Sequence, residues 1–197
     1  MINLAAVIDN LTAFYPLDGK RIIHVGVDGG ILTGYSGTAK EIVGIDSNPA
    51  IEPILAAKLM AENLTGKFQV RIMDFLHYTQ RADVVFFEFC LHEMENPLTS
   101  IMHALTIAPT VLIVDHAYNS QWSWYGCETE KLERSWAAIN QFEVRHSAKF
   151  EETQHFDSFE DLHQKLSVLG AESLARIEPL REEHPIGISM PYEACLL

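Results

Sequence analysis

The sequence is short of basic residues and has no long apolar run, and each shortage excludes a class of partner. Lys and Arg number 14 against 27 Asp and Glu, which gives a formal net charge of −13. So acidic a surface repels phosphate backbones and anionic lipids. No apolar run approaches the ~20 uninterrupted residues needed to cross a bilayer. We therefore expect no nucleic-acid partner and no membrane partner.

Cysteine is also scarce, and its spacing excludes two kinds of small-domain scaffold. Cys90, Cys127 and Cys195 are far apart and form no Cys-x-x-Cys pair. This argues against a disulfide framework and against a structural zinc site. Residues 1–10 carry Asp9 and no basic cluster, unlike a secretory signal. We expect a cytoplasmic protein with reduced thiols.

The hydrophobic period alternates between helical and strand-like spacing, which predicts an α/β domain with a mostly parallel sheet. The length of 197 residues suits one domain spanning 1–197. Predicted helices begin the chain at 4–14 and follow the caps Asn48 and Asn96. The predicted strands cover 22–25, 42–45, 68–73, 84–89 and 111–114.

Residues 117–170 break this rhythm and are rich in aromatic residues and histidine. We interpret them as a helical and aromatic insertion that could cover a substrate site, with two helices joined by a polar loop. Ser158 and Asp161 are spaced as a capping box for the second helix. The tail then predicts two antiparallel extended stretches, 173–177 and 186–196, on either side of a charged turn.

The most informative segment is the strand at 22–25, which runs into Gly26, Gly29 and Gly30. Glycine lets a backbone approach a ligand closely, and a carboxylate at the end of the next strand, Asp46, can accept hydrogen bonds from two ribose hydroxyls. A nucleotide-type binding edge is one interpretation. The other is a tight turn with Asp46 as a helix cap beside Ser47.

The order of glycine loop, Asp46, Asp74, Glu88 and a closing hairpin resembles the class I S-adenosylmethionine-dependent methyltransferases, of the small-molecule type, from about residue 15 to 197. The resemblance implies a Rossmann-like seven-stranded, mostly parallel sheet with the last strand antiparallel and helices on both faces. It also implies that S-adenosylmethionine lies across the carboxyl ends of the first four strands.

On the nucleoside side, the resemblance implies that Asp46 holds the ribose, and we assign Ser47 beside it to the same site. Asp74 would accept a hydrogen bond from the adenine amino group. Phe75 would pack near the adenine ring.

On the methionine side, the resemblance assigns Gly26 and Gly30 to the methionine part and Glu88 and Phe89 to the surroundings of the sulfonium. The donor is a cation, which acidic groups nearby favour. Its transfer depends mainly on aligning donor and acceptor, so no fixed catalytic triad is needed.

The chain departs from the family pattern at two positions. His24 stands where an acidic residue is usual, and Asp28 stands in place of the middle glycine of the loop. In one interpretation the Asp28 carboxylate compensates for His24 and belongs to the cofactor site. In the other, cofactor binding is weakened or lost.

Candidate catalytic residues follow the fourth and fifth strands. His92, Asp115 and His116 could position the acceptor or act as a base. For the two histidines a structural hydrogen-bonding role is the alternative. Glu88, Asp115 and His116 are possible ligands for a hard cation, but they lack any established ligand spacing, so no metal is predicted.

The aromatic cluster Trp122, Trp124 and Tyr125 is predicted to bind substrate, because aromatic faces can enclose a cationic or planar acceptor. Simple packing is the alternative. The same insertion could form the interface of a homodimer.

The favoured function is therefore S-adenosylmethionine-dependent methyl transfer to a small molecule, whose identity the sequence leaves open. A protein that binds the cofactor or a nucleoside without turnover is the first alternative. An NAD-dependent oxidoreductase is the second. The chain lacks the full G-x-G-x-x-G pattern and the length for a separate catalytic domain, which argues against the oxidoreductase.

Overall fold

A seven-stranded sheet forms the centre of the molecule in the computed structural model, which describes residues 3–27, 34 and 37–197. Its strands are, in chain order, β1 (Arg21–Val25), β2 (Glu41–Asp46), β3 (Phe68–Ile72), β4 (Val84–Glu88), β5 (Val111–His116), β6 (His146–Phe150) and β9 (Tyr192–Leu196). Their spatial order is β3-β2-β1-β4-β5-β9-β6. Pairs among β1 to β5 are parallel, whereas β9 runs antiparallel to both β5 and β6. The predicted Rossmann-like sheet is confirmed.

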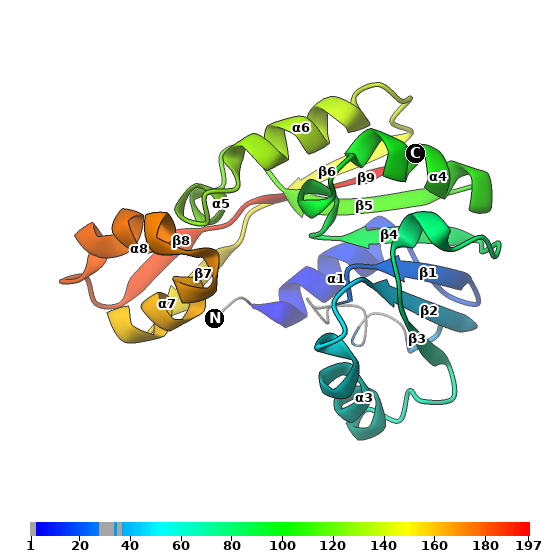
Figure 1. Ribbon diagram of the computed structural model, residues 1–197, viewed down its shortest axis with the longest axis horizontal. Coiled ribbons are helices and arrows are strands. Elements are labelled where there is room, and N and C mark those ends of the chain that lie inside the picture. The colour runs from blue at the N-terminus through cyan, green and yellow to red at the C-terminus, as the bar shows by residue number, and fades with distance from the viewer. Residues whose placement is uncertain (1–2, 28–33, 35–36) are drawn as a thin grey trace.

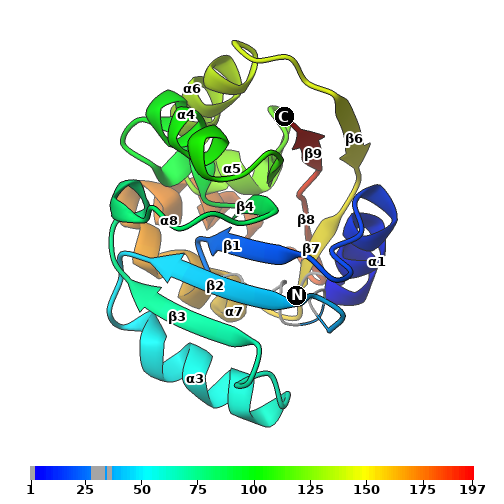
Figure 2. The same cartoon turned by 90° about the vertical axis from the view of Figure 1, so that its right-hand side faces the viewer.

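Helices cover both faces of the sheet. Successive side chains of a strand point to opposite faces, so neighbouring residues pack against different helices. On one face lie α1 (Leu4–Phe14) and α3 (Ile51–Ala61), and on the other lie α4 (Pro97–Ile107) and α6 (Thr129–Ile139), as Figures 1 and 2 show. Phe86 packs with the α1 and α3 side, and the next residue, Phe87, packs with the α4 and α6 side. Both are fully buried. Such continuous apolar strands are typical of a parallel sheet covered on both faces.

Helix α4 and the helix that begins at Phe159 start where a short polar side chain accepts a hydrogen bond from a backbone N–H of the first turn, whereas α3 and α6 have no such side-chain cap. The Asn96 side chain accepts a hydrogen bond from Thr99 N at 3.1 Å and precedes Pro97, which suits the first turn of α4. Ser158 accepts from Asp161 N at 3.2 Å and donates to the Asp161 carboxylate at 2.7 Å. The predicted caps at Asn96 and Ser158 are confirmed. The predicted cap at Asn48 is wrong, because α3 begins at Ile51 with Ala50 before it and no side chain caps it.

A smaller unit extends from one end of the sheet and has its own apolar cluster (Figure 1). Its elements are α5 (Gln121–Tyr125), β7 (Thr153–Phe156), α7 (Phe159–Leu166), α8 (Ala171–Ile177) and β8 (Ile186–Ser189). β7 and β8 pair antiparallel as a separate two-stranded sheet. Single-turn 3-10 helices, at Phe75–His77, Leu91–Glu93, Ser167–Leu169 and Glu178–Leu180, join the larger elements.

Two further local predictions are wrong. Residues 173–177 belong to helix α8, in which Ser173 and Ile177, four residues apart, share one buried face. The predicted polar loop contains β6 and β7. β6 is an edge strand with no fully buried side chain, so its sequence carries little apolar alternation. Pairing with β9, rather than hydrophobic burial, places it in the sheet.

No helix among the residues that the structure describes is both long enough and apolar enough to pass through a membrane.

Gly44 in the middle of β2 offers a test of the packing between the sheet and its neighbours. A Cβ at this position would lie 2.6 Å from Phe68 Cε1 and 2.8 Å from Val27 Cγ1. We expect Gly44→Ala to lower the free energy of unfolding by about 1–3 kcal/mol, the usual cost of overpacking. Urea denaturation followed by tryptophan fluorescence measures it. Gly66→Ala is the matched control, because nothing lies within 4 Å of its added Cβ. Equal stabilities for the two variants would contradict the packing described.

Candidate functional site

One cavity opens at the carboxyl ends of β1, β2, β3 and β4 and encloses about 590 Å³. Because these four strands are parallel neighbours, their carboxyl ends meet at one edge of the sheet. The predicted site residues that the structure brings together in its lining are Gly26, Asp46, Ser47, Asp74, Phe75, Glu88 and Phe89. The lining also includes residues that the sequence did not single out, namely Met73, Leu76, Cys90 and the segment 93–96.

Asp46 ends β2 with a half-buried carboxylate on the cavity. Its Oδ1 accepts a hydrogen bond from Asn48 N at 2.8 Å, which fixes the carboxylate at the strand end. Asn48 in turn accepts from Ala50 N at 3.0 Å, just before α3 begins. Asp46 is thus part of a turn and also lines the cavity, but it does not cap α3, which begins at Ile51.

Asp74 and Phe75 lie just beyond β3. The Asp74 Oδ1 atom accepts a hydrogen bond from Leu76 N at 2.9 Å and so caps the short helix Phe75–His77. Phe75 is 5% exposed, and its ring packs edge-on against Phe87, with the ring centroids 5.3 Å apart. Leu76 is 38% exposed beside it and lines the cavity. Most of the exposed apolar surface at this position therefore comes from Leu76 rather than Phe75.

Glu88 ends β4, and His24 of the neighbouring strand β1 lies against it. His24 Nε2 and Glu88 Oε2 are 2.8 Å apart, and both side chains are almost fully buried. The imidazole also stacks on Phe86, with the ring centroids 5.3 Å apart. The unusual histidine in the first strand is therefore a buried partner of the glutamate on the cavity.

Gly26 occupies a position that only glycine fits. Its φ is +75°, in the left-handed region, and an added Cβ would lie 2.4 Å from Cys90 Cβ. The Cys90 thiol donates a hydrogen bond to Val25 O at 3.1 Å. Burial, with the charges of Asp115 and Glu88, raises the pKa of this thiol well above its usual value. Cys90 is therefore a neutral group that packs between the ends of β1 and β4.

Phe89 has a φ of 47°, a left-handed conformation that non-glycine residues rarely adopt. Its backbone N–H donates to Val114 O at 2.8 Å, and its ring packs against His116, with the ring centroids 4.9 Å apart. Such strain persists only where surrounding contacts hold it, and it clusters at functional sites. Here it turns the chain sharply at the end of β4, beside the cavity.

The candidate catalytic residues form one buried network. Asp115 is fully buried and accepts hydrogen bonds from His92 Nδ1 at 2.6 Å, His92 N at 3.2 Å and His116 N at 2.9 Å. Trp136 Nε1 donates to His116 O at 2.8 Å and ties α6 to the same strand end. In the structure His92, Asp115 and His116 are absent from the described cavity lining, and their contacts position neighbouring segments.

The two histidines of this network carry different charges. Burial lowers the pKa of His116 to about 4, so that its ring is neutral at neutral pH. Burial also acts to lower the pKa of His92. Its hydrogen bonds to Asp115 and Glu93 and the nearby charge of Glu128 outweigh burial and raise that pKa to about 10. His92 is therefore protonated at neutral pH.

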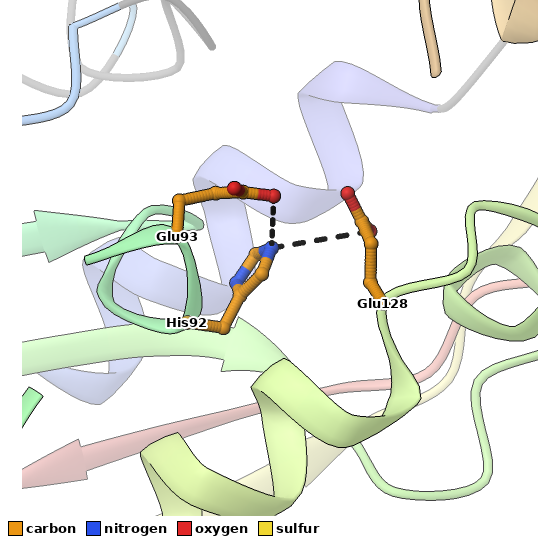
Figure 3. Close-up of side chains that lie close together, drawn as sticks. All are labelled: His92, Glu93 and Glu128. Atoms are coloured by element: carbon orange, nitrogen blue, oxygen red, sulfur yellow. Dashed lines mark ion pairs between the residues drawn. The ribbon is translucent and has the colours of Figure 1, made fainter. Parts of the chain in front are cut away.

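Two glutamates face the other nitrogen of His92, as Figure 3 shows. His92 Nε2 lies 3.5 Å from Glu93 Oε1 and 3.9 Å from Glu128 Oε2. The hydrogen bond with His92 and the ion pair with Lys131 lower the pKa of Glu93 to about 2. Burial raises the pKa of Glu128 to about 7. Sequence reasoning missed this cluster, because Glu128 is distant along the chain and nothing in its local pattern points toward His92.

The structure gives a different partner to each of the possible cation ligands Glu88, Asp115 and His116. Glu88 lies against His24, Asp115 bonds His92, and His116 packs on Phe89.

The aromatic cluster divides between the smaller unit's interior and its surface. Trp122 is 8% exposed and stacks on Phe156, with the ring centroids 6.2 Å apart, inside the smaller unit. Trp124 is 49% exposed and carries the Arg176 guanidinium 5.0 Å from its ring centroid. Tyr125 packs edge-on against Trp124. None of the three is among the described residues that line the cavity.

Asp28, Gly29 and Gly30 lie outside the described residues. Their assignment to the cofactor site stays a prediction.

No protein-family model matches this sequence, and no curated protein matches it. Solved structures do match. A candidate methyltransferase from Bacillus halodurans C-125 is 15% identical, with 98% of this chain aligned to 97% of that one and a TM-score of 0.66. A SAM-dependent methyltransferase from Aquifex aeolicus is 15% identical, with coverages of 96% and 89% and a TM-score of 0.57.

A third matching structure is of a protein named as a decarboxylase. The precorrin 8w decarboxylase of Methanobacterium thermoautotrophicum is 11% identical, with coverages of 97% and 88% and a TM-score of 0.62. At such identities the likeness concerns the fold alone. Together with the strand order and the antiparallel β9, it shows that the chain has the fold of the class I S-adenosylmethionine-dependent methyltransferases.

Proposed function

We propose that the protein binds S-adenosylmethionine in the cavity at the strand ends and transfers its methyl group to a small-molecule acceptor. The observation that carries the proposal is the gathering of carboxylates in this one cavity. Asp46, Asp74 and Glu88 follow three different strands and line the same space. This arrangement suits a ligand that combines ribose hydroxyls, an adenine amino group and positive charge.

The place of the cavity in the sheet supports the proposal. From β1 the chain proceeds outward through β2 and β3, and then returns to β4 on the other side of β1. The order of strands therefore reverses between β1 and β4. In open α/β sheets, ligands bind outside the carboxyl ends of the strands at such a reversal. A volume of about 590 Å³ is within the ordinary range for small-molecule sites.

The charge of the cavity favours this cofactor over a nicotinamide dinucleotide. Besides the strand-end carboxylates, Glu93 and Glu95 line the cavity. S-adenosylmethionine carries a sulfonium and an ammonium group but no phosphate, so acidic groups attract its positive end. A dinucleotide would bring a pyrophosphate to the same carboxylates, and like charges at short range are unfavourable.

In this reaction the role of the cavity residues would be to position the cofactor and the acceptor. When bound, the cofactor supplies a methyl group on a positively charged sulfur, which becomes a neutral thioether on transfer. The Asp46 carboxylate would accept hydrogen bonds from the ribose hydroxyls, while Met73 and Leu76 would form an apolar wall for adenine. Segment 93–96 would border the acceptor. Alignment of two reactants can lower a barrier by about 7–11 kcal/mol, so such a site needs no fixed catalytic triad.

A protein that binds this cofactor without transferring its methyl group is the second candidate. The likeness to a protein named as a precorrin 8w decarboxylase supports this candidate, because the fold by itself does not require methyl transfer. Mass spectrometry of a nucleoside that copurifies with the protein tests the binding shared by both candidates. Transfer of labelled methyl groups to a metabolite extract then separates them.

Asp46→Ala tests the ribose assignment. Loss of hydrogen bonds to a charged acceptor should weaken binding by about 1.5–3 kcal/mol, or roughly 10–150-fold. Isothermal titration calorimetry with S-adenosylhomocysteine measures the change. Asp18→Ala serves as the control, because Asp18 is exposed and is absent from the described cavity lining. An unchanged affinity in the Asp46 variant would place the ribose elsewhere.

Glu88→Gln tests whether the cavity selects for positive charge. Glutamine keeps the shape of the side chain and removes its charge. S-adenosylmethionine is positive at sulfur and its demethylated product is neutral there, so the first ligand should lose about tenfold more affinity than the second, an electrostatic difference of about 1.4 kcal/mol. Competitive binding of the two ligands to each variant gives this ratio, which is independent of the amount of folded protein. Equal losses of affinity for the two ligands would show that Glu88 does not lie near the sulfonium.

A further inference from the structure

Three side chains of the types that bind metal ions lie close together beside the cavity, and they come from two distant parts of the chain. His92 and Glu93 belong to the 3-10 helix Leu91–Glu93, and Glu128 immediately precedes α6. One ligand atom from each lies within 4.8 Å of the other two. Figure 3 shows both carboxylates turned toward the imidazole.

The distances between these atoms suit a shared ion. His92 Nε2 is 3.5 Å from Glu93 Oε1 and 3.9 Å from Glu128 Oε2. Two ligands of a tetrahedral ion with bonds of about 2.1 Å are about 3.4 Å apart. Small side-chain rotations would therefore bring the three atoms to bonding distance of one point.

The imidazole is held in the orientation that a metal ligand needs. Its Nδ1 bonds Asp115 Oδ1 at 2.6 Å, which directs Nε2 toward the two glutamates. Asp115 is itself fixed by the backbone N–H groups of His92 and His116. A carboxylate behind a histidine is the usual outer contact of a metal-bound imidazole, because it sets the ring orientation and raises its basicity. This contact is an observation separate from the cluster of acids.

The groups around the cluster carry a net negative charge, which favours the binding of a cation. Three carboxylates face His92, those of Glu93, Glu128 and Asp115, and Lys131 pairs with Glu93 at 2.7 Å. Asp115 is fully buried and Glu128 is 8% exposed, so water screens them little. To bind a metal through Nε2, His92 must release its proton to water, and the groups then sum to two negative charges, which a divalent ion balances.

We propose that His92, Glu93 and Glu128 form a binding site for a divalent transition-metal ion of the Zn²⁺ or Mn²⁺ type. One imidazole nitrogen and two carboxylate oxygens suit such an ion, since imidazole favours transition metals over Mg²⁺ and Ca²⁺. Three protein ligands leave coordination positions for water or for an oxygen of another molecule.

The site adjoins the cavity through one shared residue. Glu93 belongs both to the three ligands and to the cavity lining. A bound ion would therefore lie at the edge of the cavity, where its open positions can hold an oxygen of the acceptor. This role rests on the proposed methyl transfer, whereas the metal site itself does not.

Titration of the whole protein with metal alone tests the site. After treatment with a chelator and dialysis, the protein is titrated with Zn²⁺ by calorimetry and with Mn²⁺ by electron paramagnetic resonance. We expect one ion per chain. Glu128→Gln and Glu93→Gln should each weaken binding by tenfold or more. Glu130→Gln is the matched control, because it removes the same charge from an exposed position of α6.

Two results would overturn the proposal: no binding of either ion, or losses in the Glu93 and Glu128 variants no greater than in the Glu130 control. Glu93 is half-exposed, so its variant should fold even if the buried Glu128 variant does not. Circular dichroism checks this. The titrations contain neither methyl donor nor acceptor, so their failure leaves the proposed function standing, and failure of cofactor binding leaves the metal result standing.

Discussion

The buried carboxylate of Asp115 is the interaction on which the arrangement around the cavity depends. A charge removed from water is tolerated only where hydrogen bonds and opposite charge replace its hydration. Asp115 obtains both from His92, through the protonated imidazole and the backbone N–H, and it gains a third bond from His116 N. These bonds hold the segment after β4 against the end of β5. They thereby place Glu93, and with it one wall of the cavity.

The pair of His24 and Glu88 shows how a departure from a family pattern can be absorbed by its neighbours. The resemblance led us to expect an acidic group in the first strand, and His24 replaces it. In the structure Glu88 supplies a carboxylate from the adjacent strand, and His24 lies 2.8 Å from it. Where β1 and β4 lie side by side, the carboxylate therefore comes from β4 instead of β1. The compensation by Asp28 stays a prediction, because this residue lies outside the described part of the chain.

The central strands and most helices were predictable because their signals are local. Buried strands such as Val84–Glu88 contain continuous apolar runs, here residues 84–87, and Asn96 with Pro97 specifies a helix start within two residues. β6 and α8 were missed because long-range pairing or packing decides their state. The position of Asp46 on the cavity was also predictable, because the carboxyl ends of neighbouring parallel strands lie at the same edge of the sheet. The approach of Glu128 to His92 depends on how α6 packs, which no local pattern encodes.

Local charge, rather than the net charge of the protein, decides which ligand the cavity favours. A formal charge of −13 spread over the surface is screened within about 8 Å at physiological ionic strength. Glu88 is 2% exposed and acts at contact distance, where screening is weak. The same fold can therefore serve different reactions when a few strand-end residues change, since the sheet supplies only the edge. For this chain the carboxylates at that edge argue for a positively charged ligand, and the fold by itself does not.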